Sequence, residues 1–112
     1  QLKALREEGV LIFASGNVVH NLRLLDWDNP DSAAPWAEDF DSQIKNFILA
    51  GEFDKVVNYR DLGHGAKMAV PTPDHFYPLL YALGAANRKD KVKVFNEARI
   101  MGSLSMTSYI FG

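Results

Sequence analysis

The sequence of 112 residues predicts an α/β fold in which helices flank a central mixed sheet. Three patterns lead to this expectation. The apolar run Val10–Ser15 has no polar alternation, which is typical of a strand covered on both faces. Apolar residues recur at helical spacing over 35–50, whereas polar and apolar residues alternate over 103–110. Because the chain starts inside a helical pattern, we expect residues 1–112 to be a fragment of a longer chain.

The first quarter of the chain predicts a helix end, a strand and a loop. The stretch "QLKALREEG" is typical of the closing turns of a helix, with Gly9 as its stop. The strand Val10–Ser15 follows, and Gly16 permits a sharp exit from the sheet. Residues 26–34 are rich in turn formers and predict a loop.

The helix predicted over 35–50 has clear start and stop signals. Pro35 suits the first helical position, acidic residues crowd the positive end of the helix dipole, and Gly51 follows the last turn. A short second helix is expected over 52–59. The apolar stripe of the first helix indicates core packing rather than a ligand site, and it consists of Trp36, Phe40, Ile44, Phe47 and Ile48.

The second half predicts a break, a helix and two strands. Gly63 and Gly65 interrupt the helical pattern and indicate a loop. Thr72 is expected to cap a helix that begins at Pro73 and ends at Gly84. The stretches "VKVF" and 103–110 predict strands in an antiparallel edge or hairpin. The helix stripe is Phe76, Leu79, Leu80 and Leu83, and Leu104, Met106 and Ile110 share one face of the last strand.

Composition excludes several classes of function. The formal net charge of −2 lacks the basic footprint of a nucleic-acid-binding domain. The longest apolar run, Val10–Ala14, is far too short to span a membrane, and no signal-peptide pattern opens the chain. With no cysteine, disulfides, thiol nucleophiles and cysteine-bound metals are excluded, and a cytoplasmic location is expected. Any metal would therefore be held by histidine or carboxylate.

Three histidines are the candidates for chemistry. His20 lies just beyond the carboxyl end of the predicted strand, which is where open α/β sheets usually bind ligands. Its polar neighbours Ser15, Asn17 and Asn21 are able to hydrogen-bond a ring nitrogen or a substrate oxygen. His75 falls at the third position of a predicted helix, where the dipole favours a neutral ring able to bind a metal. His64, flanked by glycines in a predicted loop, is expected to be structural or exposed.

The two favoured histidines do not complete a metal site by themselves. A stable mononuclear site takes three or four protein ligands, and the separation of His20 from His75 matches no compact metal-binding motif. Other chemistries fit less well. "ASGNV" lacks the second glycine of a nucleophile elbow, and "GHGAKMAV" does not keep the spacing of a P-loop.

Three stretches resemble one family: "GVLIFASGNVVHNLR", "AVPTPDHFYPLLYALGAA" and "IMGSLSMTSYIFG". They are similar to the carboxyl-terminal part of the 4,5-DOPA branch of the class III extradiol (LigB-like) dioxygenases. The resemblance implies an α/β enzyme that opens a catechol such as DOPA with O₂ and a non-haem Fe²⁺, with Zn²⁺ as a possible occupant. It implies that His75 is a metal ligand and that His20 is either a further ligand or the catalytic acid/base. It also implies that Val18, Phe76 and Tyr77 wall the catechol ring.

The sequence departs from this family in two respects. Val70 stands where many relatives have a histidine, and the segments that carry the family's other metal-binding histidines are absent from residues 1–112. We therefore expect a missing amino-terminal half to supply the remaining ligands and the isolated chain to bind metal poorly. Two alternatives stay open: a non-catalytic binding domain of the same fold, and a metal-dependent hydrolase. A homo-oligomer is also possible.

Overall fold

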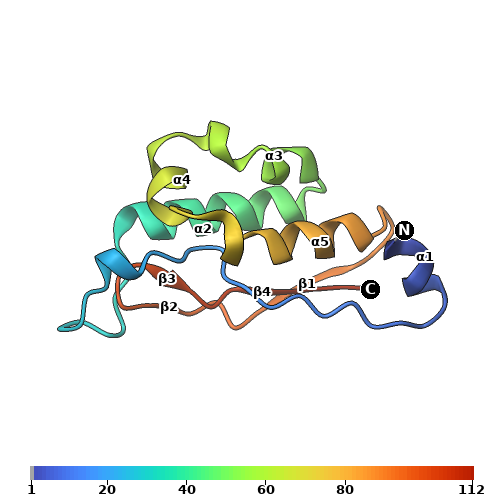
Figure 1. Cartoon of the computed structure of the whole chain (residues 1–112), viewed down its shortest axis with the longest axis horizontal. Helices are drawn as coiled ribbons and strands as arrows, with labels where there is room; N and C mark the ends of the chain where they lie inside the picture. The colour runs from blue at the N-terminus through green and yellow to red at the C-terminus, as the bar shows by residue number, and fades with distance from the viewer. Residues whose placement is uncertain (1) are drawn as a thin grey trace.

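The longest helix, α2, lies at the centre of the molecule. The computed structural model describes residues 2–112, and Figure 1 shows helices α2 to α5 lying above a lower layer of strands. The amino-terminal segment runs along that lower layer. In chain order the elements are α1 (Leu2–Glu7), η1 (Leu22–Leu24), α2 (Pro35–Leu49), α3 (Phe53–Val57), η2 (Tyr59–Leu62), α4 (His64–Ala69), η3 (Pro73–His75), α5 (Tyr77–Ala85), β1 (Val92–Phe95), β2 (Arg99–Ile100), β3 (Leu104–Ser105) and β4 (Ser108–Phe111).

Helix α2 follows the start and stop signals in its sequence. Pro35 occupies its first turn, and Gly51 adopts a φ of 72° just beyond its end, a conformation that costs glycine little. Phe40, Ile44 and Ile48 are at most 1% exposed, and the aromatic rings of Trp36 and Phe47 pack against the same core. The predicted helix and its role in the core are confirmed.

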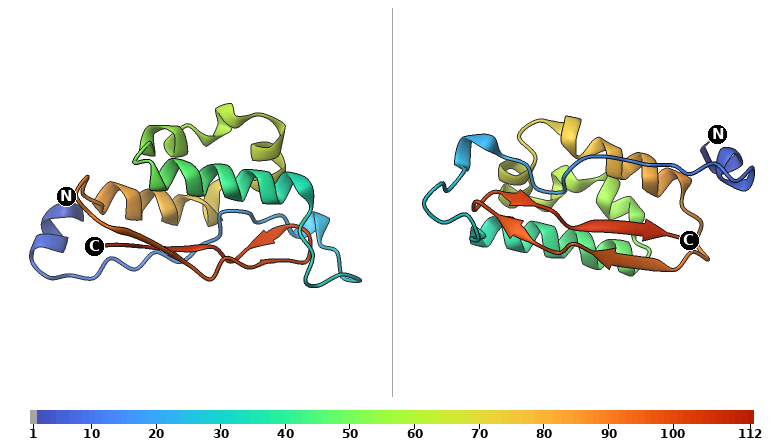
Figure 2. Two further views of the ribbon diagram at one scale, coloured as in Figure 1. Left: turned by 180° about the vertical axis from the view of Figure 1, so that it is seen from behind. Right: turned by 90° about the horizontal axis from the view of Figure 1, so that it is seen from below.

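The strands form two small antiparallel sheets. β1 pairs with β4, and β2 pairs with β3. The predicted antiparallel arrangement is confirmed, although the expected last strand is divided into β3 and β4 by residues 106–107. Helices and strands are thus mixed in one fold, as the predicted α/β class requires, and Figure 2 shows helices α2 to α5 gathered on one side of the strands.

The buried face of the last strands is polar rather than apolar. Ser105 and Thr107 are buried, whereas Met106 and Ile110 are 38% and 52% exposed. The predicted alternation is correct, but the hydroxyl-bearing face is the one that faces helix α2. This orientation needs a polar partner inside the core, because buried hydroxyls without hydrogen bonds are costly.

Asp41 of α2 is that partner. Its side chain is 1% exposed, and its two oxygens accept hydrogen bonds from Ser105 Oγ at 2.6 Å and Thr107 Oγ1 at 2.8 Å. Arg99 Nε of β2 donates a third at 3.1 Å. A carboxylate this deeply buried is tolerated only when charge and hydrogen bonds are both satisfied. Asp41 therefore fixes α2 to β2, to β3 and to the segment that leads into β4.

The prediction of a strand buried on both faces at Val10–Ser15 is wrong for this chain. The segment is extended, but no described strand pairs with it, and Leu11 and Phe13 are each 84% exposed. An apolar run identifies a segment that is suited to burial, yet it does not supply the neighbouring strands that would bury it. The predicted helix end before it is confirmed at α1 and Gly9, while Gln1 lies outside the described residues.

Two further boundaries differ from expectation. The predicted loop around Gly63 and Gly65 contains α4, because Gly63 absorbs the turn with a φ of 86° and the buried Ala66 and Ala69 hold the helix against the core. Thr72 makes no side-chain cap. The helix expected from Pro73 is a short 3₁₀ turn, η3, followed by α5, which runs one residue beyond Gly84.

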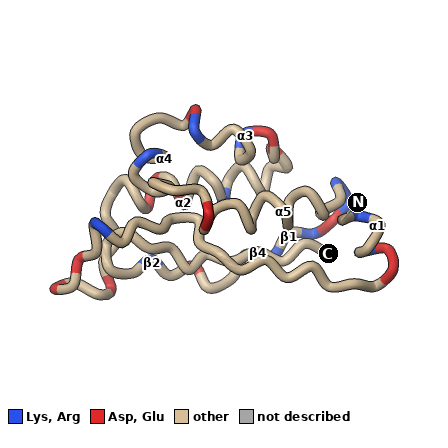
Figure 3. Tube along the Cα trace, in the orientation of Figure 1, with Lys and Arg blue, Asp and Glu red and all other residues tan. Residues whose placement is uncertain are grey.

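Acidic and basic residues are interspersed along the chain trace (Figure 3). The absence of a nucleic-acid partner stays a prediction. Within residues 2–112, no helix has the length and apolar character needed to cross a membrane.

Replacing Asp41 with alanine should destabilise the fold strongly. The change leaves a guanidinium and two buried hydroxyls without their acceptor, so we expect the free energy of unfolding to fall by about 3–5 kcal/mol. Urea denaturation measures this value. Asp39→Ala, an exposed position on the same helix, serves as the control and should change stability by less than about 0.5 kcal/mol. Similar losses in both variants would contradict the role given to Asp41.

Candidate functional site

The structure brings His20 and His75 together. Their rings are stacked with centroids 3.6 Å apart and an interplanar angle of 8°. His20 follows the extended amino-terminal segment, while His75 ends the short η3 turn that precedes α5. Two histidines that are distant in the chain thus form one candidate site, as the sequence analysis expected.

The position of His20 is fixed by its backbone. Its N–H donates to the carbonyl oxygen of Ala69 at the end of α4, at 2.9 Å, and His20 forms an isolated antiparallel bridge with Leu104 of β3. The adjacent Val19 carbonyl accepts from the Ser105 N–H at 3.0 Å. His20 is therefore held between α4 on one side and β3 on the other.

His75 is held by the segment that leads to His20. The Asn17 N–H donates to the His75 carbonyl at 2.8 Å, and Gly16 packs directly on the same peptide group. A Cβ atom at Gly16 would lie 2.2 Å from the His75 carbonyl oxygen and 3.0 Å from Pro78 Cγ. Glycine is required here because the two backbones approach too closely for any side chain.

The nearby amides hold the backbone rather than the imidazole rings. Asn17 Nδ2 donates to the Ser105 carbonyl at 2.8 Å, and Asn21 Nδ2 donates to the Met68 carbonyl at 2.8 Å. Within residues 2–112 neither side chain hydrogen-bonds an imidazole ring, because both NH₂ groups are committed to main-chain carbonyls. Their contribution is to fix the segment that carries His20.

The environment of the pair favours a neutral His20. Burial lowers the pKa of His20, and the neighbouring His75 lowers it further, whereas Asp74 opposes the shift. Nδ1 of His75 lies 2.7 Å from Oδ2 of Asp74, and this contact contributes to lowering the pKa of the Asp74 carboxyl. The site thus offers one ring that favours its uncharged form beside a second ring whose Nδ1 faces a carboxylate.

The residues expected to form apolar walls have different surroundings. Val18 and Phe76 are 4% and 1% exposed and belong to the hydrophobic core, where Phe76 packs on the ring of Tyr59. Val18 also lines a hollow together with His75. Tyr77 lines a different hollow. His64, as expected, is exposed, at the start of α4.

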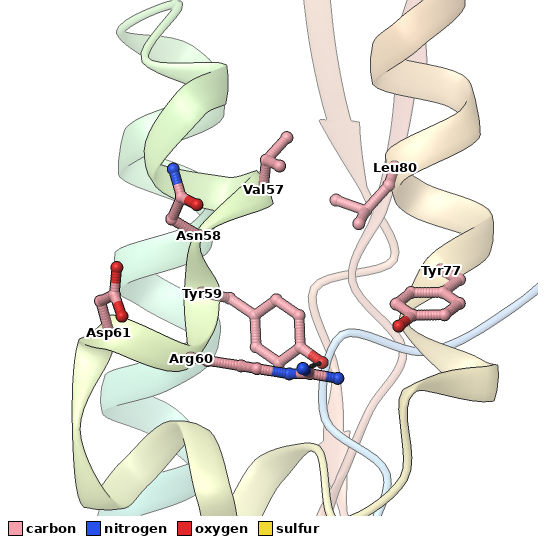
Figure 4. Close-up of a pocket in the computed structure, with 7 residues that line it drawn as sticks. All are labelled: Val57, Asn58, Tyr59, Arg60, Asp61, Tyr77 and Leu80. Atoms are coloured by element: carbon pink, nitrogen blue, oxygen red, sulfur yellow. Dashed lines mark hydrogen bonds between the residues drawn. The ribbon is translucent and has the colours of Figure 1, made fainter.

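Two hollows lie near these residues. The larger, of about 620 Å³, is lined by residues 10–18, by α5, by β4 and by His75 at the site itself. The smaller, of about 390 Å³, lies between η2 and α5 (Figure 4). In it Arg60 Nε donates to the Tyr59 hydroxyl at 3.3 Å, and this hydrogen bond raises the pKa of Arg60. Neither histidine lines the smaller hollow, so the candidate site is the histidine pair.

The donor set is incomplete within this chain. Residues 2–112 contain no group of three histidine, cysteine, aspartate or glutamate side chains able to hold a metal ion. A mononuclear metal centre needs at least three protein ligands. The two imidazoles would therefore supply only part of such a site.

Gly16→Ala should disturb the site and lower stability. The new methyl group would overlap the His75 carbonyl, so we expect the free energy of unfolding to fall by about 1–3 kcal/mol. Gly84→Ala is the control: it lies in α5 with no atom within 4 Å of its new Cβ and should stabilise by about 0.5–1 kcal/mol. Thermal or urea unfolding compares them, and equal stability of the two variants would contradict the close approach at Gly16.

Comparison with known proteins identifies relatives of this chain. The family model described as the catalytic LigB subunit of aromatic ring-opening dioxygenase matches residues 1–112. A protein of Escherichia coli K12 named 4,5-DOPA dioxygenase extradiol is 44% identical over 115 residues, which cover 100% of this chain and 42% of that protein. A protein of the same name from Portulaca grandiflora is 38% identical and covers 98% of this chain and 41% of its own length.

A solved structure shows the same fold. The crystal structure of an uncharacterized protein from Escherichia coli K12 superposes with a TM-score of 0.87 at 43% identity, covering 96% of this chain and 45% of that one. The chain spans less than half the length of these relatives and corresponds to their carboxyl-terminal part. The match over the whole sequence shows that this chain belongs to the LigB family of aromatic ring-opening dioxygenases.

Proposed function

We propose that this chain is the carboxyl-terminal part of an extradiol dioxygenase that opens the ring of a catechol such as DOPA with O₂. The family match and the relatives named 4,5-DOPA dioxygenase extradiol support the reaction class. The observation that carries the proposal is the stacked pair of His20 and His75, which the fold assembles from two distant segments.

In this proposal His75 would hold a divalent metal, Fe²⁺ or in its place Zn²⁺, and His20 would lie beside it. The incomplete donor set fits a ligand that shares its ion with residues outside this chain. When bound, the ion would supply a Lewis acid that stabilises the catecholate anion. The amino-terminal part of the complete protein would contribute the remaining ligands.

His20 would move the proton of the substrate hydroxyl. A neutral imidazole has a free ring nitrogen able to accept that proton, and the lowered pKa of His20 keeps the ring neutral at pH 7. The neighbouring His75 also disfavours the protonated form, which makes His20 ready to return the proton. His20 as an additional metal ligand is the other role that its position allows.

The test uses a completed protein, in which this chain replaces the matching carboxyl-terminal part of the Escherichia coli relative. With Fe²⁺ loaded, we expect O₂ uptake that depends on L-DOPA. His75→Ala should lose both bound metal and uptake. If His20 is the acid/base, His20→Ala should lower kcat by about 100- to 10,000-fold and retain the metal. Oxygen-electrode traces and metal analysis measure these effects.

His64→Ala is the matched control, because His64 is exposed on α4 and makes no contact with the pair; its metal content and kcat should equal those of the parent protein. Loss of metal in His20→Ala would assign His20 as a ligand. Unchanged uptake in His20→Ala would reject both roles. A folded, iron-loaded protein without uptake on any catechol would instead favour a non-catalytic binding domain.

A further inference from the structure

The smaller hollow, between η2 and α5, has no part in the function proposed above. Its volume of about 390 Å³ lies within the range of small-molecule binding sites, and neither histidine of the pair lines it. The side chains of Tyr59, Arg60 and Tyr77 converge at one end of it (Figure 4). A concave surface with a few convergent polar groups is typical of a ligand site.

The guanidinium of Arg60 is held in place by two tyrosines. Its Nε donates to the Tyr59 hydroxyl at 3.3 Å, and its central carbon lies 5.8 Å from the centre of the Tyr59 ring. The hydroxyl of Tyr77 points toward the same guanidinium in Figure 4, and both phenols raise the pKa of Arg60. Residues from η2 and from α5 therefore fix one positive charge at the wall of the hollow.

Tyr59 provides a rigid base for this arrangement. Its side chain is 4% exposed, and its ring packs on Phe76 with centroids 4.4 Å apart. A phenol that accepts a hydrogen bond from Arg60 keeps its own O–H group for donation. A ligand in the hollow would meet donors that are already oriented, so its binding orders few side chains.

The positive charge of Arg60 has no carboxylate partner within residues 2–112. None of the ion pairs that the structure describes includes Arg60, and the side chain of Asp61 points away from the guanidinium in Figure 4. With Nε bound to a phenol, the two terminal NH₂ groups remain as a planar fork that matches the two oxygens of a carboxylate. The hollow therefore offers a position for an anion.

The other walls of the hollow favour an organic anion of low charge. Val57 and Leu80 face each other across it and would contact an apolar group (Figure 4). One guanidinium balances a single negative charge, and Asp61, which also lines the hollow, would repel a doubly charged phosphate. A carboxylate with an apolar or aromatic body matches both properties.

We propose that the hollow between η2 and α5 binds a small organic carboxylate with an apolar or aromatic body. The carboxylate lies against Arg60 and the hydroxyls of Tyr59 and Tyr77. The body of the ligand lies between Val57 and Leu80. Simple acids and free amino acids share this chemistry. The site is separate from the histidine pair and does not depend on the reaction proposed above.

An NMR titration of the metal-free completed protein with 3-phenylpropionate tests the site. Without metal, the acid is unable to bind through an ion at the histidine pair, so the outcome is independent of the proposed function. We expect saturable shifts of the Arg60 Nε–H signal and of amides in η2 and α5, with a Kd of about 1 mM or lower. A folded protein without these shifts, or with shifts confined to other elements, would overturn the proposal.

Three further probes identify the chemical group that is recognised. 3-Phenylpropan-1-ol lacks the carboxylate and should bind at least about 10-fold more weakly than the acid. L-Phenylalanine separates the two sources: binding supports a site for amino acids, and its absence supports a site for simple acids. Equal affinity for the alcohol, or tighter binding of inorganic phosphate, would reject an organic carboxylate as the ligand.

Substitution of Arg60 gives a second readout. Arg60→Gln removes the charge and should raise the Kd for 3-phenylpropionate by about 10- to 100-fold. Arg88→Gln is the matched control, because Arg88 is exposed after α5 and does not line the hollow; its Kd should equal that of the parent protein. The same Kd in both variants would contradict the role of Arg60.

Tyr77→Phe keeps the ring and removes only the hydroxyl, so it tests the site if Arg60→Gln disturbs η2. We expect the Kd to rise by about 2- to 10-fold, and an unchanged Kd would remove Tyr77 from the site and count against the proposal. If the completed protein is insoluble, the titration uses this chain co-expressed with the amino-terminal part of the Escherichia coli relative, and the same outcomes apply.

Discussion

The buried carboxylate of Asp41 is the constraint on which the rest of the structure depends. It joins the interior of α2 to Arg99, Ser105 and Thr107, and so determines which face of the last strands turns inward. The backbone N–H of Ser105 in turn donates a hydrogen bond to the carbonyl of Val19, next to His20. One charged group in the core therefore fixes the position and orientation of β3, the strand that His20 contacts.

The predictable part of the fold is the part governed by local chemistry. Helix α2 has proline, acidic residues and glycine at the expected positions, and β1 alternates as a half-buried strand should. Helix α4 was missed because its two buried alanines give a weak pattern beside two glycines. The alternation of residues 103–110 shows that the strand has a polar and an apolar face, but not which of them is buried. The polar face is buried because the distant Asp41 accepts hydrogen bonds from Ser105 and Thr107.

The candidate site was predictable as a pair of residues but not as an arrangement. Its position after an apolar segment singles out His20, and the third position of a predicted helix singles out His75. Their stacking, the backbone anchor at Ala69 and the close passage of Gly16 are long-range contacts without a local signal. The amides of Asn17 and Asn21 illustrate the same limit, since sequence shows that they can donate hydrogen bonds but not which acceptor they find.

The bridge between His20 and Leu104 has a consequence for how the protein is made. These residues are separated by most of the chain, and the Asn17 amide reaches an equally distant carbonyl at Ser105. Such non-local pairing is slow, since a long loop must close before the contact gives any stabilisation. On the ribosome, His20 emerges well before the strand that anchors it. The backbone at His20 therefore gains its contact with β3 only after residues 104–105 have been made.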